Sequence, residues 1–188
     1  VINIVKRLHS FFCEFMSLSA MPDFYDERWN AQEQAQRPKN LERIDRITRV
    51  VEKGCRHLST VSLIDIGCGN GWILDSIEKT FGDRATLCGI EPSHVGYQNS
   101  RQRLPRATIL HGTLNELLPL GPFSVAVCSE VIEHVADSKS FIDDLASVLS
   151  PGGMLVMTTP NGRFRNEYFQ ETGAQLQPVE NWLRSSDL

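Results

Sequence analysis

The chain has 188 residues, which predicts one domain large enough to bury most of its apolar surface and argues against a second independent domain. Apolar residues make up 41% and charged residues 22%, the usual proportions of a soluble globular protein. The formal net charge of -4 gives no general attraction to a phosphate backbone, so no nucleic-acid partner is expected.

The cysteines indicate a reducing compartment. They are odd in number and contain no C-x-x-C pair, so we expect buried small apolar side chains rather than disulfides, and a cytoplasmic location. No apolar run reaches the length of a membrane span. The five are Cys13, Cys55, Cys68, Cys88 and Cys128.

Residues 1–20 carry apolar side chains at helical spacing, which predicts a helical extension before a domain that covers residues 21–188. A membrane-surface helix and a signal peptide are alternatives. Glu14 and His9 interrupt the apolar stretch, so a helix packed on the domain or on a partner is favoured.

Two further helical segments are expected between residue 21 and the first strand. Tyr25 and Trp29 are four residues apart in an aromatic and acidic stretch, residues 23–29, where they could anchor a helix to the core. Apolar residues then recur at three-to-four spacing, so residues 40–57 are predicted to form an amphipathic helix that ends near Gly54.

Residues 61–71 predict a buried strand and a tight turn with three alternating glycines, followed by a helix that ends at Gly82. Glycine lets a ligand lie directly against the backbone and adopts angles that other residues resist. The turn is therefore a candidate nucleotide cradle. Trp72 stands where the dinucleotide fingerprint requires glycine, which makes a NAD-dependent oxidoreductase a less favoured alternative.

A second strand, residues 85–91, ends in Glu91. Ligands gather at the carboxyl ends of parallel strands, and an acid at this place can accept hydrogen bonds from both ribose hydroxyls. We therefore expect Glu91 to face the mouth of the glycine turn, and we expect no side chain to fill the space above Gly69. The spacing between the glycine turn and Glu91 occurs in NAD enzymes and in other nucleoside-binding proteins alike, so it does not distinguish them.

Three further strands are predicted at residues 107–111, 123–128 and 154–161. Ser93 and Asp137 are good N-caps for the helices that follow strands two and four.

The motif Asp65-x-Gly67-x-Gly69-x-Gly71 resembles the first motif of the class I, Rossmann-like S-adenosylmethionine-dependent methyltransferases. Four later blocks follow in the family's order: the acid at the end of strand two, the Gly-Thr after strand three, the segment after strand four that begins at Glu130, and "LSPGG" with "TPN" around strand five. The resemblance covers residues 40–162 and is nearest to the ubiquinone-biosynthesis O-methyltransferase-like group.

The resemblance implies a Rossmann-like α/β three-layer sandwich with a mostly parallel central sheet, and S-adenosylmethionine as the cofactor. It implies methyl transfer to a small-molecule acceptor, with oxygen favoured over nitrogen or carbon. A catalytically weak or inactive nucleoside-binding module is the alternative. Residues 23–29 resemble a segment that often folds over the cofactor as a lid.

The resemblance also implies the cofactor contacts. Asp65 would help hold the loop and the amino end of the cofactor. Thr113 stands where the family usually has an acid that reaches the adenine amino group, so Thr113 or Asn115 could substitute through a neutral hydrogen bond. The full expected set is Asp65, Gly67, Cys68, Gly69, Gly71, Glu91, Pro92, Thr113, Leu114 and Ser129.

The acids and histidine after strand four are the catalytic candidates. If residues 130–134 are helical, Glu130, Glu133 and His134 share one face, and His134 is the best candidate general base. The segment also resembles the metal-binding part of small-RNA 2′-O-methyltransferases, but no later histidine completes such a site, so a metal is not favoured. It stays an alternative, because two carboxylates and one imidazole still suit a divalent ion. The remaining alternative is that Glu133 and His134 only brace the helix.

Family members complete the sheet with two more strands, which form a hairpin beside strand five. After Asn161 only 27 residues remain, and they have no strong strand pattern. We expect the domain to lack this hairpin and to be truncated at its carboxyl end. Strand five would then be an exposed edge that residues 163–188, a missing segment or a partner chain must cover.

Overall fold

The structure is a computed structural model that describes residues 26, 29, 38–114, 121–172 and 182. The predicted extension, residues 1–20, lies outside the described residues, as do all residues of the 23–29 segment except Asp26 and Trp29.

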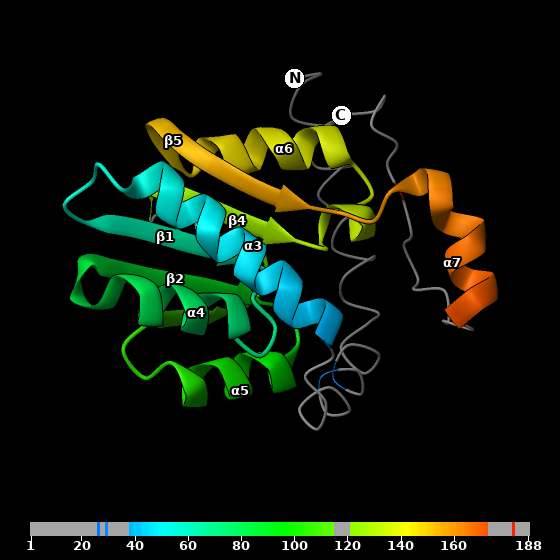
Figure 1. The fold of residues 1–188 in the computed structure, drawn as a ribbon, viewed down its shortest axis with the longest axis horizontal. Helices are drawn as coiled ribbons and strands as arrows, with labels where there is room; N and C mark the ends of the chain where they lie inside the picture. Colours follow the sequence, from blue (N-terminus) through cyan, green and yellow to red (C-terminus); the bar gives the residue numbers. More distant parts are fainter. Residues whose placement is uncertain (1–25, 27–28, 30–37, 115–120, 173–181, 183–188) are drawn as a thin grey trace, which may run out of the picture.

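A five-stranded parallel sheet forms the centre of the fold (Figure 1). The strand order is β3-β2-β1-β4-β5. The chain therefore winds outward from β1 to β3 and returns to place β4 and β5 on the other side of β1. The strands are β1 (Val61–Ile66), β2 (Ala85–Glu91), β3 (Thr108–His111), β4 (Phe123–Ser129) and β5 (Leu149–Thr158).

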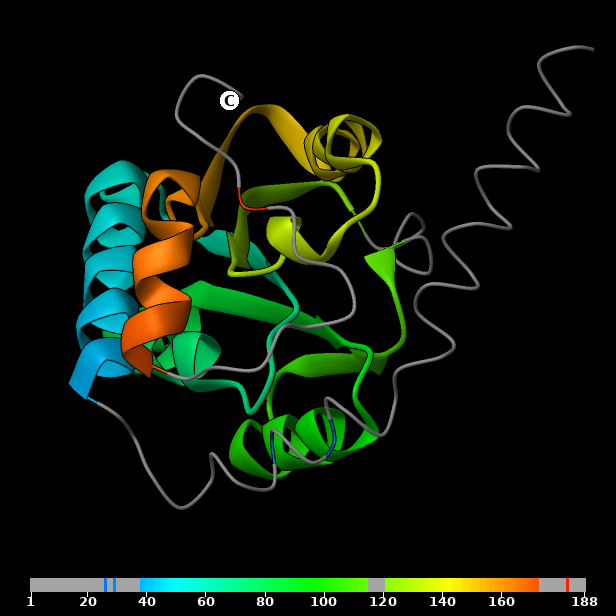
Figure 2. The same ribbon diagram turned by 90° about the vertical axis from the view of Figure 1, so that its right-hand side faces the viewer.

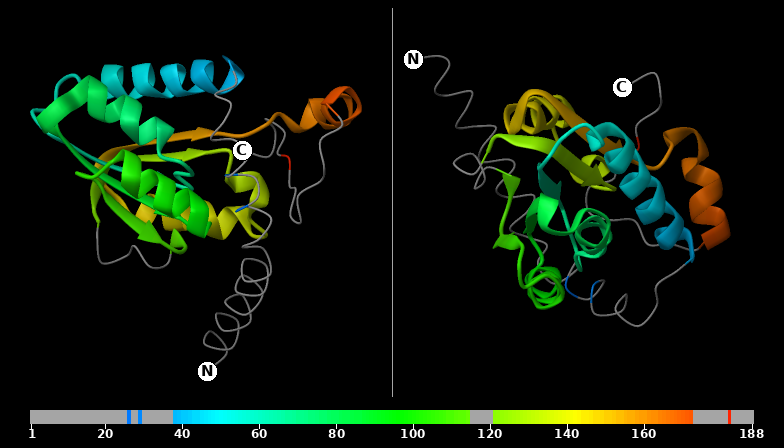
Figure 3. Two further views of the ribbon diagram at one scale, coloured as in Figure 1. Left: turned by 90° about the horizontal axis from the view of Figure 1, so that it is seen from below. Right: turned by 60° about the vertical axis from the view of Figure 1, so that its left-hand side comes forward.

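Helices cover both faces of the sheet (Figures 1 and 3). On one face lie α3 (Pro38–Cys55), α4 (Trp72–Phe81) and α5 (His94–Arg103), and on the other lies α6 (Ser138–Ser147). The predicted three-layer α/β fold is confirmed.

The alternation of side chains along the strands divides the core in two. Leu63 of β1 packs in the cluster formed with α3 and α4, whereas its neighbour Ile64 packs in the cluster formed with α6. Both are fully buried. A strand covered on both faces reads as a continuous apolar run, which explains the pattern of residues 61–66. Within the described residues all four cysteines are buried and unpaired, as predicted.

The helix starts follow the predicted caps. Ser93 accepts a hydrogen bond on Oγ from the Gly96 N–H (3.1 Å), and Asp137 accepts one on Oδ1 from the Ser140 N–H (3.0 Å). Each side chain satisfies a backbone donor that the first helical turn leaves unpaired.

The predicted bounds of the fifth strand, residues 154–161, were wrong. The fifth strand begins at Leu149 and ends at Thr158, because the Ser-Pro-Gly-Gly turn is taken into the strand through a register shift against β4. The residues after Asn161 form helical structure for which no prediction was made, namely a 3-10 turn (Gly162–Phe164) and α7 (Arg165–Thr172). Figure 2 views the carboxyl ends of the strands, beyond which α7 lies.

Within the described residues β5 is the last strand of the sheet. The same part of the chain contains no helix that is both long and apolar enough to cross a membrane.

Candidate active site

The glycine turn joins β1 to α4 at the carboxyl end of β1. Gly67, Gly69 and Gly71 have φ values of 72°, 53° and 78°, the left-handed region that only glycine enters at low cost. The N–H groups of Gly67 and Cys68 donate to the Ile90 carbonyl of β2 at 2.9 and 3.0 Å. The turn is therefore fixed to the neighbouring strand, and its glycines are required by its shape.

Glu91 closes β2 and faces this turn, as expected. Its Oε2 accepts a hydrogen bond from the Gly69 N–H at 2.7 Å, and its Oε1 accepts one from the Ser93 N–H at 2.9 Å. The side chain is 3% exposed. One carboxylate thus connects the glycine turn to the start of α5.

Burial raises the pKa of Glu91 to about 7, even though its two backbone donors favour the charged form. Asp65 lies beneath the same turn and is also buried, which raises the pKa of its carboxyl well above the ordinary range, with the nearby Glu91 charge as a smaller cause. Two buried carboxyl groups beneath one turn disfavour double ionisation.

Asp65 does not hold the loop through its side chain. Neither of its carboxyl oxygens has a hydrogen-bond partner among the described residues. Buried acceptors normally have a partner. Glu91 makes the contact with the loop that the resemblance implied for Asp65.

The space above Gly69 is filled, which contradicts our expectation. A methyl group built on Gly69 would clash with Cη2 of Trp29 and lie 2.6 Å from its Cζ2, so the indole ring packs directly against the glycine backbone. The same ring reaches Gly96 at the start of α5, where a methyl group would meet its Cδ1 at 3.1 Å. A nucleoside in contact with Gly69 must share this space with Trp29 or displace it.

Asp26 holds the same segment in place. Its Oδ1 accepts hydrogen bonds from the Ser93 hydroxyl (2.5 Å) and the Val95 N–H (3.2 Å). Asp26 and Trp29 therefore both contact the first turn of α5, and the anchoring role considered for Trp29 accounts for these contacts.

The other expected cofactor contacts differ in accessibility. Cys68 directs its sulfur at the sheet, where a methyl group on Gly89 would meet it at 2.9 Å, so the residue presents only its backbone to the turn. Leu114 is 7% exposed and belongs to the core cluster with α6. Pro92 is exposed and Thr113 is half-buried.

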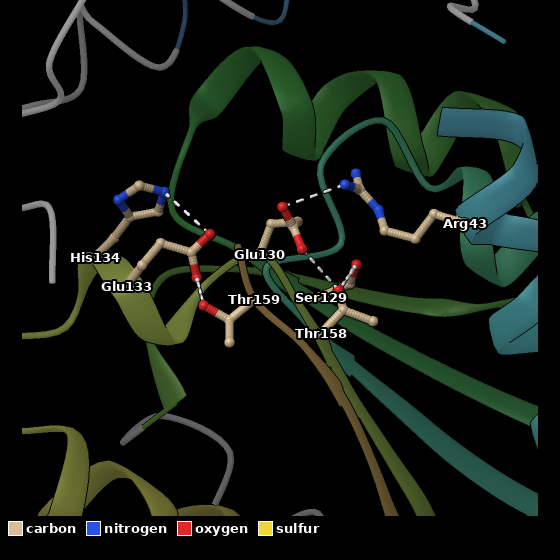
Figure 4. Close-up of polar contacts among 7 residues, drawn as sticks. All are labelled: Arg43, Ser129, Glu130, Glu133, His134, Thr158 and Thr159. Atoms are coloured by element: carbon tan, nitrogen blue, oxygen red, sulfur yellow. Dashed lines mark hydrogen bonds and ion pairs between the residues drawn. The ribbon is translucent and has the colours of Figure 1, made fainter. Parts of the chain in front are cut away.

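A second polar cluster lies where β4 and β5 end (Figure 4). Thr158 donates its hydroxyl to Oε1 of Glu130 at 2.9 Å, and the Ser129 hydroxyl lies 2.8 Å from the Thr158 hydroxyl. Arg43, from α3, places Nη1 3.3 Å from Oε2 of Glu130. Glu130 is thus held by the neighbouring strand and by a helix on one face of the sheet.

The shared helical face predicted for Glu130, Glu133 and His134 is wrong. Only Ile132–His134 forms a helical turn, a single 3-10 turn, and Glu130 precedes it with a left-handed φ of 59°. The three side chains therefore do not follow i, i+3 and i+4 spacing.

Glu133 and His134 nevertheless lie together. His134 Nε2 is 3.9 Å from Oε1 of Glu133, whose Oε2 accepts a hydrogen bond from the Thr159 hydroxyl at 3.1 Å. The Glu133 side chain is 2% exposed and that of His134 is 17% exposed. A buried carboxylate beside an imidazole that solvent reaches is suited to orienting a proton acceptor.

The glycine turn after β1 and the polar cluster around Glu130 after β4 meet between these two strands. A methyl group built on Gly67 would lie 2.5 Å from Cγ2 of Val131, the residue after Glu130. This place is the topological switch point of the sheet, where open α/β folds bind their ligands.

Sequence reasoning missed the contacts that Arg43, Asp26 and Thr158 make here. Of these three residues, only Thr158 had a signal in the sequence, because it lies beside the "TPN" block at the end of the fifth strand.

The parallel sheet, the glycine turn after β1 and the acid that ends β2 define the Rossmann-like α/β class. The chain belongs to the methyltransferase domain family, whose model matches residues 27–186.

Curated relatives of the chain are methyltransferases. A ubiquinone biosynthesis O-methyltransferase of Rhodopseudomonas palustris (strain BisB18) is 27% identical over 146 residues, which cover 74% of this chain and 56% of the relative. A probable S-adenosylmethionine-dependent methyltransferase of Mycolicibacterium smegmatis is 35% identical over 100 residues, or 53% of this chain and 38% of the relative. The chain thus spans about half the length of the first of these relatives.

Solved structures agree on the fold. The plantazolicin methyltransferase BpumL, in complex with a pentazolic desmethylPZN analog and SAH, superposes with a TM-score of 0.67 at 18% identity, and the match covers 95% of this chain and 68% of that chain. Streptomyces venezuelae DesVI has a TM-score of 0.52 at 27% identity, with 63% of this chain and 50% of its own covered.

Proposed function

We propose that this chain is the core of an S-adenosylmethionine-dependent methyltransferase that acts on a small molecule, with oxygen favoured as the acceptor atom. The observation that carries the proposal is the contact between Glu91 and the Gly69 N–H, which joins the acid of β2 to the glycine turn of β1. Family membership supports the activity, and the names of the curated relatives support oxygen as the acceptor.

The chain's residues fit a nucleoside at this turn. Glu91 has lone pairs beyond the two it uses for backbone donors, so its carboxylate can also accept hydrogen bonds from ribose hydroxyls once a nucleoside displaces the Trp29 ring from Gly69. The cofactor, when bound, supplies an activated methyl group on a sulfonium. The chain has to bind and orient both partners and exclude water.

His134 is the candidate proton acceptor. An alcohol or phenol acceptor must lose its proton during methyl transfer, and an imidazole that a carboxylate orients can take that proton near neutral pH. Glu133 is the orienting carboxylate, because it is buried and the Thr159 hydroxyl holds its other oxygen. Glu130 lies at the same end of the sheet but contacts Arg43 rather than His134.

The test is a methyl-transfer assay with labelled S-adenosylmethionine and a panel of phenols, carboxylic acids and amines. We expect label in at least one oxygen acceptor. His134→Ala should lower turnover by about 100-fold to 10,000-fold while the affinity for S-adenosylhomocysteine stays unchanged, since the imidazole acts on the acceptor. His57→Ala, at an exposed histidine, is the matched control. Unchanged turnover in His134→Ala would leave only a bracing role for this residue.

A nucleoside-binding module without catalysis is the second candidate function. The Trp29 ring on Gly69 supports weak cofactor binding and therefore a catalytically weak or inactive module, since a nucleoside would have to displace the ring. This alternative predicts weak or absent binding of S-adenosylhomocysteine that strengthens in Trp29→Ala. The methyltransferase proposal predicts binding in the unaltered chain. The oxidoreductase alternative has no support from the family match.

The cytoplasmic location and the cover over the edge of β5 remain predictions.

A further inference from the structure

The Trp29 ring occupies the part of the site that the proposed nucleoside needs. It packs against Gly69 in the glycine turn and also reaches the first turn of α5. A methyl group built on Gly96 would meet Cγ of Glu91 at 2.9 Å and Cδ1 of Trp29 at 3.1 Å, so the indole lies beside the Glu91 side chain. The ring therefore covers both groups proposed to contact the nucleoside, the backbone of Gly69 and the carboxylate of Glu91.

Asp26 fastens the same segment to the start of α5. Its Oδ1 accepts hydrogen bonds from the Ser93 hydroxyl at 2.5 Å and from a backbone N–H in the first turn of α5 at 3.2 Å. Ser93 in turn donates its own N–H to Oε1 of Glu91, whose Oε2 accepts the hydrogen bond from the glycine turn. These bonds form one continuous network from the segment of Asp26 to the glycine turn, with Ser93 and Glu91 between them.

The contact of the Trp29 ring leaves one polar group unsatisfied. The indole Nε1 is buried, and no acceptor among the described residues lies in hydrogen-bonding geometry with it. A buried donor without an acceptor costs free energy, which offsets part of the gain from burying the aromatic ring.

A ribose offers Glu91 what the indole does not. Its hydroxyl groups are donors, and the Glu91 carboxylate has acceptor positions beyond the two that the backbone N–H groups use. A nucleoside on the glycine turn therefore gains hydrogen bonds that the Trp29 ring does not make there. The ring can close this site in the free chain and still be displaced by a ligand.

We propose that Asp26 and Trp29 form an autoinhibitory contact, which closes the cofactor site of the free chain and must open before a nucleoside reaches the glycine turn. The inference rests on the proposed function, because it concerns the same cofactor site. The observed Kd then equals the intrinsic Kd divided by the fraction of chains in which the contact is open. Removing the contact raises that fraction and tightens binding, whereas removing a residue that holds the ligand weakens binding.

Titration calorimetry with S-adenosylhomocysteine compares the Kd of the unaltered chain with that of three variants. Trp29→Ala removes the ring, and we expect about threefold to thirtyfold tighter binding. Asp26→Asn keeps the shape of the side chain but loses its charge, which weakens the charge-assisted hydrogen bonds to the start of α5, so we expect about twofold to tenfold tighter binding. Asp143→Asn, at an exposed acid of α6, is the matched control for the lost charge and should leave the Kd unchanged.

Acrylamide quenching of tryptophan fluorescence reports whether the ring leaves its place. The difference in quenching between the unaltered chain and Trp29→Ala gives the contribution of Trp29. We expect this contribution to rise when S-adenosylhomocysteine binds, because the displaced ring becomes exposed to solvent. A fall on binding would mean that the ring folds over the ligand instead, and would overturn the inference.

A weaker or unchanged affinity in Trp29→Ala would refute the inference alone, since the ring would then hold the ligand or not compete with it. If thermal unfolding shows that Trp29→Ala does not fold, Trp29→Leu takes its place, with tighter binding again expected. Absence of binding by both the unaltered chain and Trp29→Ala would refute the proposed function and the inference with it. Binding by Trp29→Ala alone would support the inference and favour the catalytically weak or inactive module over the methyltransferase.

Discussion

Glu91→Gln should change how the stability of the fold depends on pH. Glu91 is 3% exposed, and burial raises the pKa of its carboxyl from 4.5 to about 7. In the unfolded chain the group has its ordinary value, so between pH 4.5 and 7 the folded chain carries more protons than the unfolded chain. Stability therefore falls as the pH rises through this range.

The size of the effect follows from the two pKa values. The stabilisation by Glu91 is fully present below pH 4.5 and is lost as the pH passes through 7, which amounts to roughly 3 kcal/mol at about 1.36 kcal/mol per pH unit. Glutamine does not ionise, so Glu91→Gln removes this dependence. Glutamine also has one acceptor oxygen for the two N–H groups of Gly69 and Ser93, so we expect a constant loss of about 1–3 kcal/mol.

The assay is urea unfolding at pH 5 and pH 8. The drop in unfolding free energy between the two should be smaller in Glu91→Gln by roughly 3 kcal/mol. Asp65 is present in both proteins, and burial, the larger cause of its raised pKa, is the same in both, so the comparison reports mainly on Glu91. Glu52→Gln, at an exposed glutamate of α3, controls for the loss of one charge. Equal pH dependence in Glu91→Gln and the unaltered chain would show that Glu91 ionises at its ordinary pKa and is not buried as described.

Two further substitutions test the local geometry. Gly69→Ala should destabilise the fold by about 2–5 kcal/mol in urea unfolding, because the new methyl group is forced against the Trp29 ring and φ is 53°. Adding Trp29→Ala should remove the clash but not the backbone strain, so equal costs in both backgrounds would place the ring elsewhere. Asp137→Ala removes the cap of α6 and should cost about 1 kcal/mol in the same assay, with no change in ligand affinity. A cost near zero would mean that the Ser140 N–H finds another acceptor.

The order of strands and helices was predictable because local patterns determine it. The apolar run of residues 61–66, the glycines that follow and the cap at Ser93 each act within a few residues, and each led to the observed element. The position of Glu91 followed from the same logic, since a residue that ends a parallel strand must lie at the ligand-binding edge.

The pairing of side chains across the fold was not predictable in the same way. Arg43 and Glu130 are far apart in the sequence, and their contact depends on how α3 packs on the sheet. Helical spacing misplaced Glu130 because its backbone turns to a left-handed conformation before the 3-10 turn begins. The bare backbone at Gly69 indicated space for a ligand, but Trp29 uses that space in the folded chain.

Titration calorimetry with S-adenosylhomocysteine, and with NAD in parallel, addresses the proposed cofactor site itself. We predict one molecule of S-adenosylhomocysteine bound per chain, no binding of NAD, and at least about tenfold weaker S-adenosylhomocysteine binding by Glu91→Ala, which loses the carboxylate at the end of β2. Absence of binding by the folded, unaltered chain, or unchanged affinity in Glu91→Ala, would contradict the assignment of the glycine turn and Glu91 as a nucleoside site.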